Sequence, residues 1–366
     1  MPNYKVVKAK DIEHGEVHRR ADRYAAWPRN NGVWKYPGDE IVVGFTSRPC
    51  SYHQPYEVQH GYSPPLSGPT TWHARSIDGG LIWEENPFTA TADMRFRKAR
   101  PDALPSEAPV DFNSPDLMIV HNQDWAAIST DRGRSFGTLC VIPSARHHWV
   151  QGRPDYVIRS DGACLLFSTV SLTRTTAPDA GSGRWLGPEG RPVVYISRNG
   201  AQSWEILSYI TPEPQDYMQI MPSAVELPDG RIIVAVRCQV PGHGFSFWTE
   251  VYASDDGGRT WSFLSRLNDL GAPADLLLLE DERVLTTYGY RTRPFGVRAK
   301  VSEDGGKSWG PEIVLRDDGK SWDLGYPRSV QLDNGEIFST YYFNELADEV
   351  DVDGGVRFIG WTRWKV

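Results

Sequence analysis

The sequence predicts an all-β fold, a six-bladed β-propeller made of four-stranded antiparallel blades. Two observations carry this prediction: a pattern with the template Ser-x-Asp-x-Gly-x-Ser/Thr-Trp that occurs five times with small variations, and a proline-initiated hairpin pattern that alternates with it. A third is composition, because 34 glycines, 27 prolines and 14 tryptophans suit many strands joined by tight turns. A fold that grows by adding similar blades also suits a chain of 366 residues.

The first pattern predicts a tight turn between two strands. Its Asp carboxylate accepts backbone N–H groups, and its Gly supplies the positive φ that such a turn needs. At least three copies follow strand-like residues, for example 193–196 before the third copy. The five copies occupy residues 76–83, 129–136, 197–204, 254–261 and 302–309.

The second pattern is a residue followed by proline, then a strand, a turn and another strand. Asp-Gly or Asn-Gly pairs lie between apolar runs at 161–162, 229–230 and 334–335, and such pairs are strong hairpin signals. The copies begin at Trp27-Pro28, Arg153-Pro154, Met221-Pro222, Ala272-Pro273 and Tyr326-Pro327.

Together the two patterns define a unit of four strands, A to D, in which the first pattern joins strands C and D. Five blades are expected at about 21–84, 92–138, 147–206, 217–263 and 270–310. A sixth begins at Tyr326 and lacks the Ser-x-Asp pattern. We expect the segment Tyr4–Lys8 to add a strand to this last blade and close the ring. Residues 1–366 would then form a single domain.

Composition narrows the class of partner. The net charge is −8 and there is no basic run, which argues against nucleic-acid binding. No apolar stretch approaches the ~18 residues that cross a bilayer, so no membrane partner is expected. The N-terminus has no apolar signal segment, and the four cysteines are widely spaced without Cys-x-x-Cys pairs. The sequence therefore predicts a cytoplasmic protein with reduced thiols.

Strand order places the A–B turns and the Ser-x-Asp turns on one face of the propeller. The opposite face receives the starts of the A strands, the ends of the B strands and the long B–C loops at 46–71, 169–192, 238–248, 289–296 and 343–355. Variable loops on a rigid scaffold are where function is expected.

Residues of this face that we expect to bind substrate are Trp27, Arg29, Arg48, Arg153, Arg237, Tyr290, Arg291 and Arg328. So many arginines in an acidic protein favour a carboxylated ligand, because Arg grips carboxylate bidentately. The alternative is that each arginine pairs with a local Asp or Glu.

The Ser-x-Asp pattern is the Asp box, or bacterial neuraminidase repeat, and the chain resembles the sialidase superfamily over nearly its whole length. The resemblance implies six blades and three arginines that hold a substrate carboxylate. It also implies a Tyr nucleophile with a Glu partner and an Asp acid/base. The stretch 325–332 resembles the segment that bears the nucleophile and places it at Tyr326. The stretch 225–237 places one arginine at Arg237, and the third falls at Arg291 or Arg298.

The chain departs from this pattern at three positions. The first arginine is missing from its expected place, because the family's Arg-Ile-Pro appears here as Ala26-Trp27-Pro28, and Arg23, Arg29 or Arg48 would substitute for it. The Glu partner falls at Met221. The first B–C loop, expected to carry the acid/base Asp, offers instead His53, His60 and Glu57.

Three functions remain open. The first is a sialidase-like exo-glycoside hydrolase that acts on a terminal acidic sugar, with Tyr326 as nucleophile and Asp155 or Asp275 as its base. Glu57 or a histidine such as His60 would protonate the leaving group. The second is a uronate-sugar lyase or unusual glycosidase that uses His and Tyr. The third is a non-catalytic propeller that binds a carbohydrate, whether an oligosaccharide or a glycoconjugate.

The sequence predicts no cofactor. The pair at 147–148 has no metal-ligand spacing around it, and the Gly-rich loop at 181–183 lacks the context of a phosphate-binding loop. A Ca²⁺ site built from loop carboxylates is the alternative that the sequence leaves open.

Overall fold

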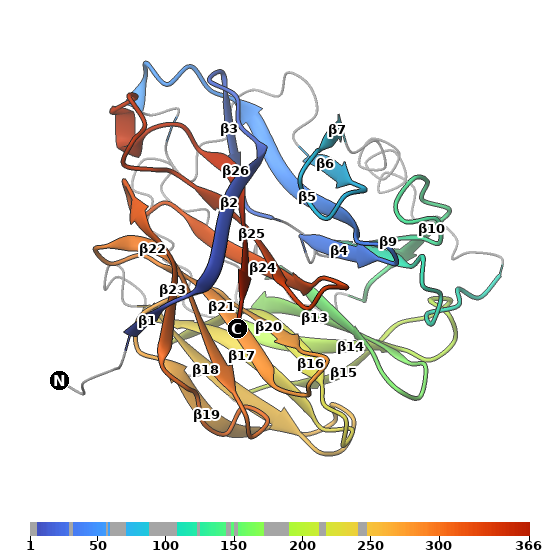
Figure 1. The fold of residues 1–366 in the computed structure, drawn as a ribbon. Helices are drawn as coiled ribbons and strands as arrows, with labels where there is room; N and C mark the ends of the chain where they lie inside the picture. Colours follow the sequence, from blue (N-terminus) through green and yellow to red (C-terminus); the bar gives the residue numbers. More distant parts are fainter. Residues whose placement is uncertain are drawn as a thin grey trace. The chain divides into compact units, whose positions relative to one another are not determined.

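A computed structural model describes residues 6–28, 32–55, 58, 71–87, 108–122, 125–143, 148–149, 153–171, 190–211, 217–240 and 247–366. The fold is an all-β, six-bladed β-propeller, as the sequence predicts, and its strands form six sheets (Figure 1). The chain divides into two compact units, which are described separately. Unit 1 comprises Met1–Phe88, Phe247–Thr249 and Leu267–Val366, and unit 2 comprises Thr89–Ser246 and Glu250–Arg266. That residues 1–366 act as one domain stays a prediction.

Unit 1 contains blades 1, 5 and 6. Blade 1 consists of β3 (Arg23–Ala26), β4 (Val33–Tyr36), β5 (Glu40–Pro49), β6 (Thr71–Ser76) and β7 (Glu84–Pro87). Blade 5 consists of β20 (Ala274–Leu278), β21 (Val284–Tyr290), β22 (Phe295–Ser302), β23 (Glu312–Gly319) and β1 (Val6–Lys8). Blade 6 consists of β24 (Gly325–Gln331), β25 (Ile337–Phe343), β26 (Phe358–Lys365) and β2 (Lys10–His18). A short 3-10 turn, η2 (Val352–Gly354), lies between β25 and β26.

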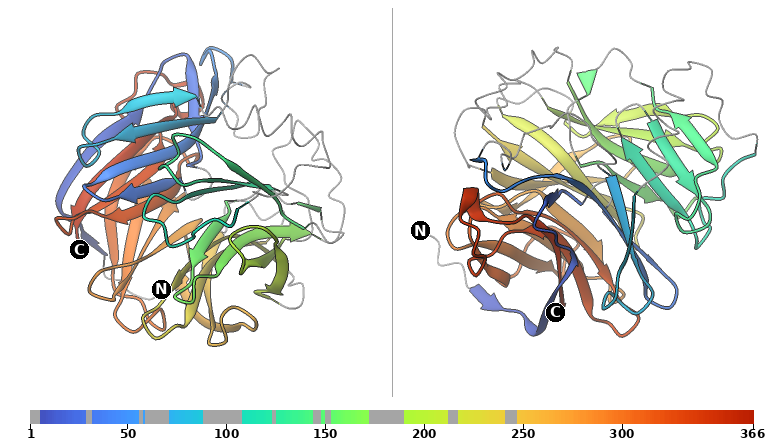
Figure 2. Two further views of the ribbon diagram at one scale, coloured as in Figure 1. Left: turned by 90° about the vertical axis from the view of Figure 1, so that its right-hand side faces the viewer. Right: turned by 90° about the horizontal axis from the view of Figure 1, so that it is seen from above.

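Blades 2, 3 and 4 follow in unit 2, although the first residues of β18 and the last of β19 fall in unit 1. Figure 2 shows the strands of these blades in colours from green to yellow. Blade 2 has three strands in the described residues, β8 (Met118–Asn122), β9 (Trp125–Ser129) and β10 (Thr138–Val141). Blade 3 has β11 (His148–Trp149), β12 (Asp155–Ile158), β13 (Cys164–Ser171), β14 (Arg191–Ser197) and β15 (Glu205–Tyr209). Blade 4 has β16 (Met218–Glu226), β17 (Ile232–Gln239), β18 (Phe247–Ser254) and β19 (Ser262–Asn268).

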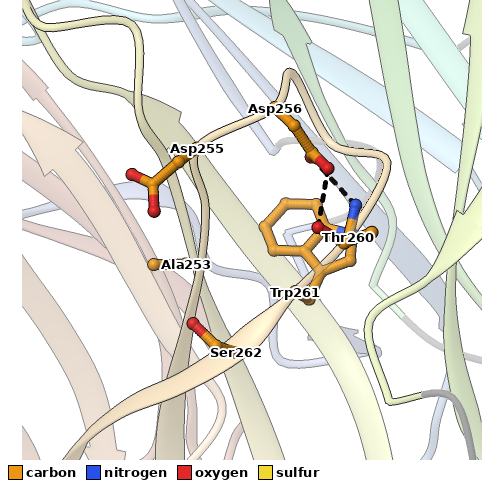
Figure 3. Close-up of a pocket in the computed structure, with 6 residues that line it drawn as sticks. All are labelled: Ala253, Asp255, Asp256, Thr260, Trp261 and Ser262. Atoms are coloured by element: carbon orange, nitrogen blue, oxygen red, sulfur yellow. Dashed lines mark hydrogen bonds between the residues drawn. The ribbon is translucent and has the colours of Figure 1, made fainter.

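The five Ser-x-Asp turns join strands C and D of blades 1 to 5, as the sequence predicts. In blade 4 the Ser254 hydroxyl donates to Asp256 Oδ1 (2.8 Å). The same carboxylate accepts the backbone N–H of Thr260 (2.9 Å) and, at Oδ2, its hydroxyl (2.6 Å; Figure 3). Gly257 and Gly258 take φ of 72° and 89°, which Gly adopts without strain. A small pocket lies against this turn, lined by Asp255 and Trp261 among others.

The N-terminal segment closes blade 6, although not with the residues expected. The strand that pairs with β26 is β2, in antiparallel register with Gly15 opposite Trp361. Val6–Lys8, predicted to join the last blade, instead pairs in parallel with β23 of blade 5. The longer β2 suits β26 because Gly15 leaves room for the Trp361 ring, which a Cβ would overlap. Of the predicted segment, Tyr4 and Lys5 lie outside the described residues.

Three of the x-Pro repeats share an unusual backbone conformation. Trp27, Met221 and Tyr326 each precede a proline and have φ of 49°, 58° and 52°. Strand A is broken between β3 and β4 in blade 1, and its register shifts at the corresponding point of β16 and β24. Bulky residues with positive φ carry strain and cluster at functional sites. The repeats therefore mark the starts of the A strands as the place to look for function.

Candidate functional site

In unit 1 the A-strand starts of blades 1 and 6 contribute Trp27 and Tyr326 to one aromatic cluster. The Tyr326 ring lies 5.8 Å from that of Tyr342 on β25, and the Trp27 ring lies 6.3 Å from Tyr342 and 5.8 Å from Tyr24 on β3. Tyr24 and Tyr342 are fully buried, whereas Trp27 is partly exposed and Tyr326 is 7% exposed. Two outer rings thus sit on a buried pair of phenols.

Arg291, directly after β21, places a buried guanidinium against this cluster. Its Nε donates to the carbonyl oxygen of Leu324 (3.1 Å) and its Nη2 donates to the hydroxyl of Tyr342 (3.2 Å). The guanidinium carbon lies 5.4 Å from the centroid of the Tyr326 ring. These hydrogen bonds both go to neutral oxygens, and the nearby charge of Asp323 acts on the guanidinium without a direct hydrogen bond between them among the described contacts.

A buried carboxylate, Asp323, lies beneath the cluster. Its Oδ1 accepts the hydroxyl of Tyr342 (2.9 Å), and its Oδ2 accepts the hydroxyl of Tyr24 (2.5 Å) and Nε of Arg357 (3.2 Å). Burial, and then the charge of Asp323, raises the pKa of both phenols well above 10. Both tyrosines therefore stay protonated and act as donors to Asp323.

Arg357 connects this carboxylate to the last B–C loop. Its Nη1 donates to the carbonyl oxygen of Gly355 and its Nη2 to that of Asp353, both at 2.6 Å. Its backbone N–H donates to the hydroxyl of Tyr52 (2.7 Å), which in turn donates to the carbonyl oxygen of Arg23 (3.0 Å). The first and the last B–C loops are thus joined at the edge of the aromatic cluster.

Two predicted site residues, Asp275 and Arg328, pair with each other. Arg328 Nη1 on β24 donates to Asp275 Oδ1 on β20 (2.8 Å), and both side chains are buried. Asp275 Oδ2 accepts the backbone N–H of Ser329 (2.7 Å). This pair connects blade 5 to blade 6. Arg328 is thus a case in which an arginine of this face pairs with an Asp of the protein. The roles of base for Asp275 and substrate ligand for Arg328 stay predictions.

The remaining described candidates of unit 1 lie around the same face. The Arg48 guanidinium on β5 is buried, 4.1 Å from the centroid of Tyr24. Tyr290 on β21 lies 4.7 Å from the guanidinium of Arg298, which donates to the carbonyl oxygens of Val297 and Arg316. Arg298 thus forms hydrogen bonds with backbone oxygens of its own blade. Of the two arginines that the resemblance offers as the third carboxylate ligand, Arg291 is the one that lies beside Tyr326.

In unit 2 the corresponding positions are buried as well. Asp155 on β12 accepts the backbone N–H of Tyr156 (2.9 Å) and of Ala224 on β16 (3.1 Å). Arg237 on β17 donates from Nη2 to Gln239 (2.9 Å), and its Nη1 lies 3.7 Å from Sδ of Met221. Arg153 is buried at the start of the same A strand as Asp155.

The repeat that these blades share also decides the family. A sequence profile described as "BNR repeat-like domain" matches residues 128–338, more than half of the chain. The chain belongs to the BNR repeat-like domain family.

Solved structures similar to this BNR repeat-like protein include sialidases. A protein of unknown function from Dyadobacter fermentans matches over 100% of both chains, with 21% identity and a TM-score of 0.69. A Hadza microbial sialidase covers 96% of this chain and 68% of its own, with 16% identity and a TM-score of 0.62. A mutant of Trypanosoma rangeli sialidase displaying trans-sialidase activity covers 98% and 59%, with 13% identity and a TM-score of 0.56. At these identities the likeness shows a fold shared with glycosidases. A search of curated proteins finds no match.

The remaining predictions from the sequence concern three site residues, the cysteines, a metal site and a membrane span. Arg29, Glu57 and His60 lie outside the described residues. All four cysteines are buried as thiols. Within the described residues no group of three or more His, Cys, Asp or Glu is arranged to hold a metal ion. No helix in the described part of the chain is long and apolar enough to cross a membrane.

Sequence reasoning missed Asp323, Tyr342 and Arg357, which organise the cluster in unit 1. One signal was available, because Asp323 stands three residues before Tyr326, next to a strand start that the x-Pro pattern marks. In the sequence Tyr342 is an ordinary residue of an apolar strand, and Arg357 follows a loop whose path the sequence does not predict. Neither residue therefore carried a signal of its own.

Proposed function

We propose that this protein is an exo-acting glycosidase of sialidase type whose substrate is a terminal sugar with a carboxylate. The observation that carries the proposal is Arg291, a buried guanidinium whose described hydrogen bonds go to neutral oxygens and which lies against Tyr326. A buried cation is best compensated by an anion, and guanidinium binds carboxylate through two parallel hydrogen bonds. The sialidase-like fold supports the same chemistry.

In this proposal Tyr326 gives its phenolic proton to Asp275, a base that the sequence predicts, and its oxygen attacks the anomeric carbon. The bond to the leaving group breaks as that group takes a proton from Glu57 or His60 of the first B–C loop. Water then gives a proton back to Glu57 or His60 and attacks the glycosyl-tyrosine, and the phenol leaves with the proton that Asp275 held. A Tyr nucleophile suits a carbon that bears a carboxylate, because an Asp or Glu would bring like charges together. Arg291 holds the sugar carboxylate, and Trp27 offers an aromatic face to the ring.

The test is turnover of aryl glycosides and acidic oligosaccharides, sialosides beside uronate-capped sugars, by the wild type and Tyr326→Phe. We expect release of the acidic sugar to fall by about a thousandfold or more in the variant, because the covalent step is lost. Tyr156→Phe is the matched control, since its ring packs against a core cluster in unit 2; its rate should stay within about twofold of the wild type. Full hydrolytic activity in Tyr326→Phe would rule out this mechanism.

A second candidate, a lyase for uronate sugars, is favoured by Met221. The sialidase resemblance implies a Glu at this position, yet here a thioether lies 3.7 Å from Nη1 of Arg237. A thioether cannot accept a proton from a tyrosine, whereas a lyase needs a cation at the carboxylate and a Tyr or His to move protons. A product with new ultraviolet absorbance from a conjugated double bond identifies the lyase. Binding of the same sugars without turnover identifies a non-catalytic propeller.

A further inference from the structure

Asp323 holds a position that neither the x-Pro pattern nor the proposed chemistry assigns. It lies between β23 and β24, is 2% exposed, and stands directly before Leu324, whose carbonyl oxygen receives Nε of Arg291. Three donors converge on its two oxygens: the hydroxyls of Tyr24 and Tyr342, and Nε of Arg357. Its carbonyl oxygen accepts Nδ2 of Asn344 (2.7 Å), so the backbone is fixed as well.

The Tyr342 hydroxyl transmits this geometry to Arg291. A phenol has a single proton, and here it is donated to Asp323. The lone pairs of the same oxygen therefore face the other way, toward Nη2 of Arg291 (3.2 Å). If the hydroxyl turned around, its proton would meet a donor, and the contact with Arg291 would be lost.

Arg291 is thus held at two points, and both depend on Asp323. One is the hydroxyl of Tyr342, and the other is the carbonyl oxygen of the residue next to Asp323. A guanidinium has five N–H donors. Arg291 uses two of them in its hydrogen bonds to described residues. Three N–H groups therefore remain for a ligand.

The same carboxylate also supports the aromatic rings. Tyr24, its second phenol, lies 5.8 Å from the ring of Trp27, and the ring of Tyr342 lies 5.8 Å from that of Tyr326. We propose that Asp323 is a positioning residue that orients Tyr342 and thereby fixes the Arg291 guanidinium beside Tyr326 to receive the carboxylate of the sugar. The ligand in this inference rests on the proposed function, whereas the orientation of Arg291 does not.

The first measurement needs no substrate. In protein labelled with ¹⁵N-arginine, the Nε–H of Arg291 should give a signal that exchanges slowly, because it is buried and bonded to Leu324; Arg291→Lys assigns it. We expect this protection to fall at least about tenfold in Asp323→Asn and in Tyr342→Phe. Tyr24→Phe is the matched control, because it removes the other phenol and leaves the path to Arg291 intact. Unchanged protection in either Asp323→Asn or Tyr342→Phe would overturn the inference, and if Asp323→Asn does not fold, unchanged protection in Tyr342→Phe overturns it alone.

The second measurement is turnover by the same variants. For an acidic sugar we expect KM to rise about tenfold or more in Tyr342→Phe with kcat nearly unchanged, because ground-state binding of the carboxylate is weakened. An aryl glycoside without a carboxylate should show a much smaller change. If the wild type turns over no glycoside, the proposed function fails, while the exchange data still decide the role of Asp323. If kcat falls and KM does not, Asp323 acts in the chemical step and the positioning role is wrong.

Discussion

The carboxylate of Asp275 accepts the backbone N–H of Ser329 at 2.7 Å and so ties the innermost strands of blades 5 and 6 together. Asp155 does the same for blades 3 and 4 through the N–H of Ala224 at 3.1 Å. Asp155 lies one residue and Asp275 two residues after the proline of its x-Pro repeat, and both donors lie two residues after the proline of the next blade. The x-Pro pattern therefore encodes a contact between neighbouring blades as well as the start of a strand.

Replacing Asp275 by Ala should destabilise the protein by about 3–5 kcal/mol, because it leaves the buried Arg328 guanidinium without this carboxylate. Urea unfolding measures the change. Asp351→Ala is the control, since that side chain is 92% exposed in its pair with Lys320 and should have no measurable effect. A stable Asp275→Ala protein that has lost turnover would instead support Asp275 as the base.

Replacing Arg291 by Lys should raise KM for an acidic sugar about tenfold, because an ammonium keeps the charge and loses the fork that matches a carboxylate. Steady-state kinetics on acidic and neutral glycosides separate this effect from general damage. Arg293→Lys is the neighbouring control, because its guanidinium is exposed beside Phe295. Equal losses on acidic and neutral substrates would contradict a carboxylate-binding role for Arg291.

Mild acid should destabilise the fold through His73. Burial, followed by the charge of Arg75, lowers the pKa of His73 from 6.5 to about 3. Between pH 6.5 and 3 the imidazole is protonated in the unfolded chain but neutral in the folded chain. The free energy of unfolding therefore falls as the pH drops from about 6.5 to about 3. Thermal unfolding at pH 7 and pH 5 measures this loss. His73→Gln should reduce the difference in stability between the two pH values, and an unchanged difference would contradict this assignment.

The two carboxylates of the blade 4 turn should behave differently when each is replaced by Ala. Asp256 accepts hydrogen bonds from the Ser254 hydroxyl and from the backbone N–H and hydroxyl of Thr260, so Asp256→Ala should cost about 1 kcal/mol. Asp255, which lines the pocket beside it, is the matched control (Figure 3). Equal midpoints of urea unfolding for the two variants would show that these bonds contribute nothing measurable.

The stabilising contribution of Asp256 in this turn should be lost at acid pH. Slight burial raises the pKa of Asp256, but hydrogen bonds from Thr260 and Ser254 outweigh it and lower the pKa from 3.8 to about 2. Because the folded pKa is depressed, this contribution is present above pH 3.8 and lost as the pH falls toward 2. The gap in unfolding midpoint between the wild type and Asp256→Ala should therefore narrow over that range.

The sequence by itself determined the repeat, the strand order and the turn chemistry. These features are local: a Ser-x-Asp-x-Gly turn and an Asn-Gly hairpin depend on residues a few positions apart, and each recurs often enough to be recognised. A local pattern also identified Trp27 and Tyr326 as candidate site residues, because both stand before a proline at the start of strand A.

Only the tertiary structure decided which of the candidate arginines serve the scaffold and which face Tyr326. Arg328 and Arg291 follow similar strand signals, yet Arg328 pairs with Asp275 and Arg291 lies against the aromatic cluster. Asp323 meets Tyr24 from the other end of the chain, 299 positions away. No local pattern encodes such a contact, because the pairing of charges across blades depends on how the sheets pack. The N-terminal strand shows the same limit, since no local pattern tells that β2 pairs with β26, where Gly15 lies opposite Trp361 and a Cβ would overlap its ring.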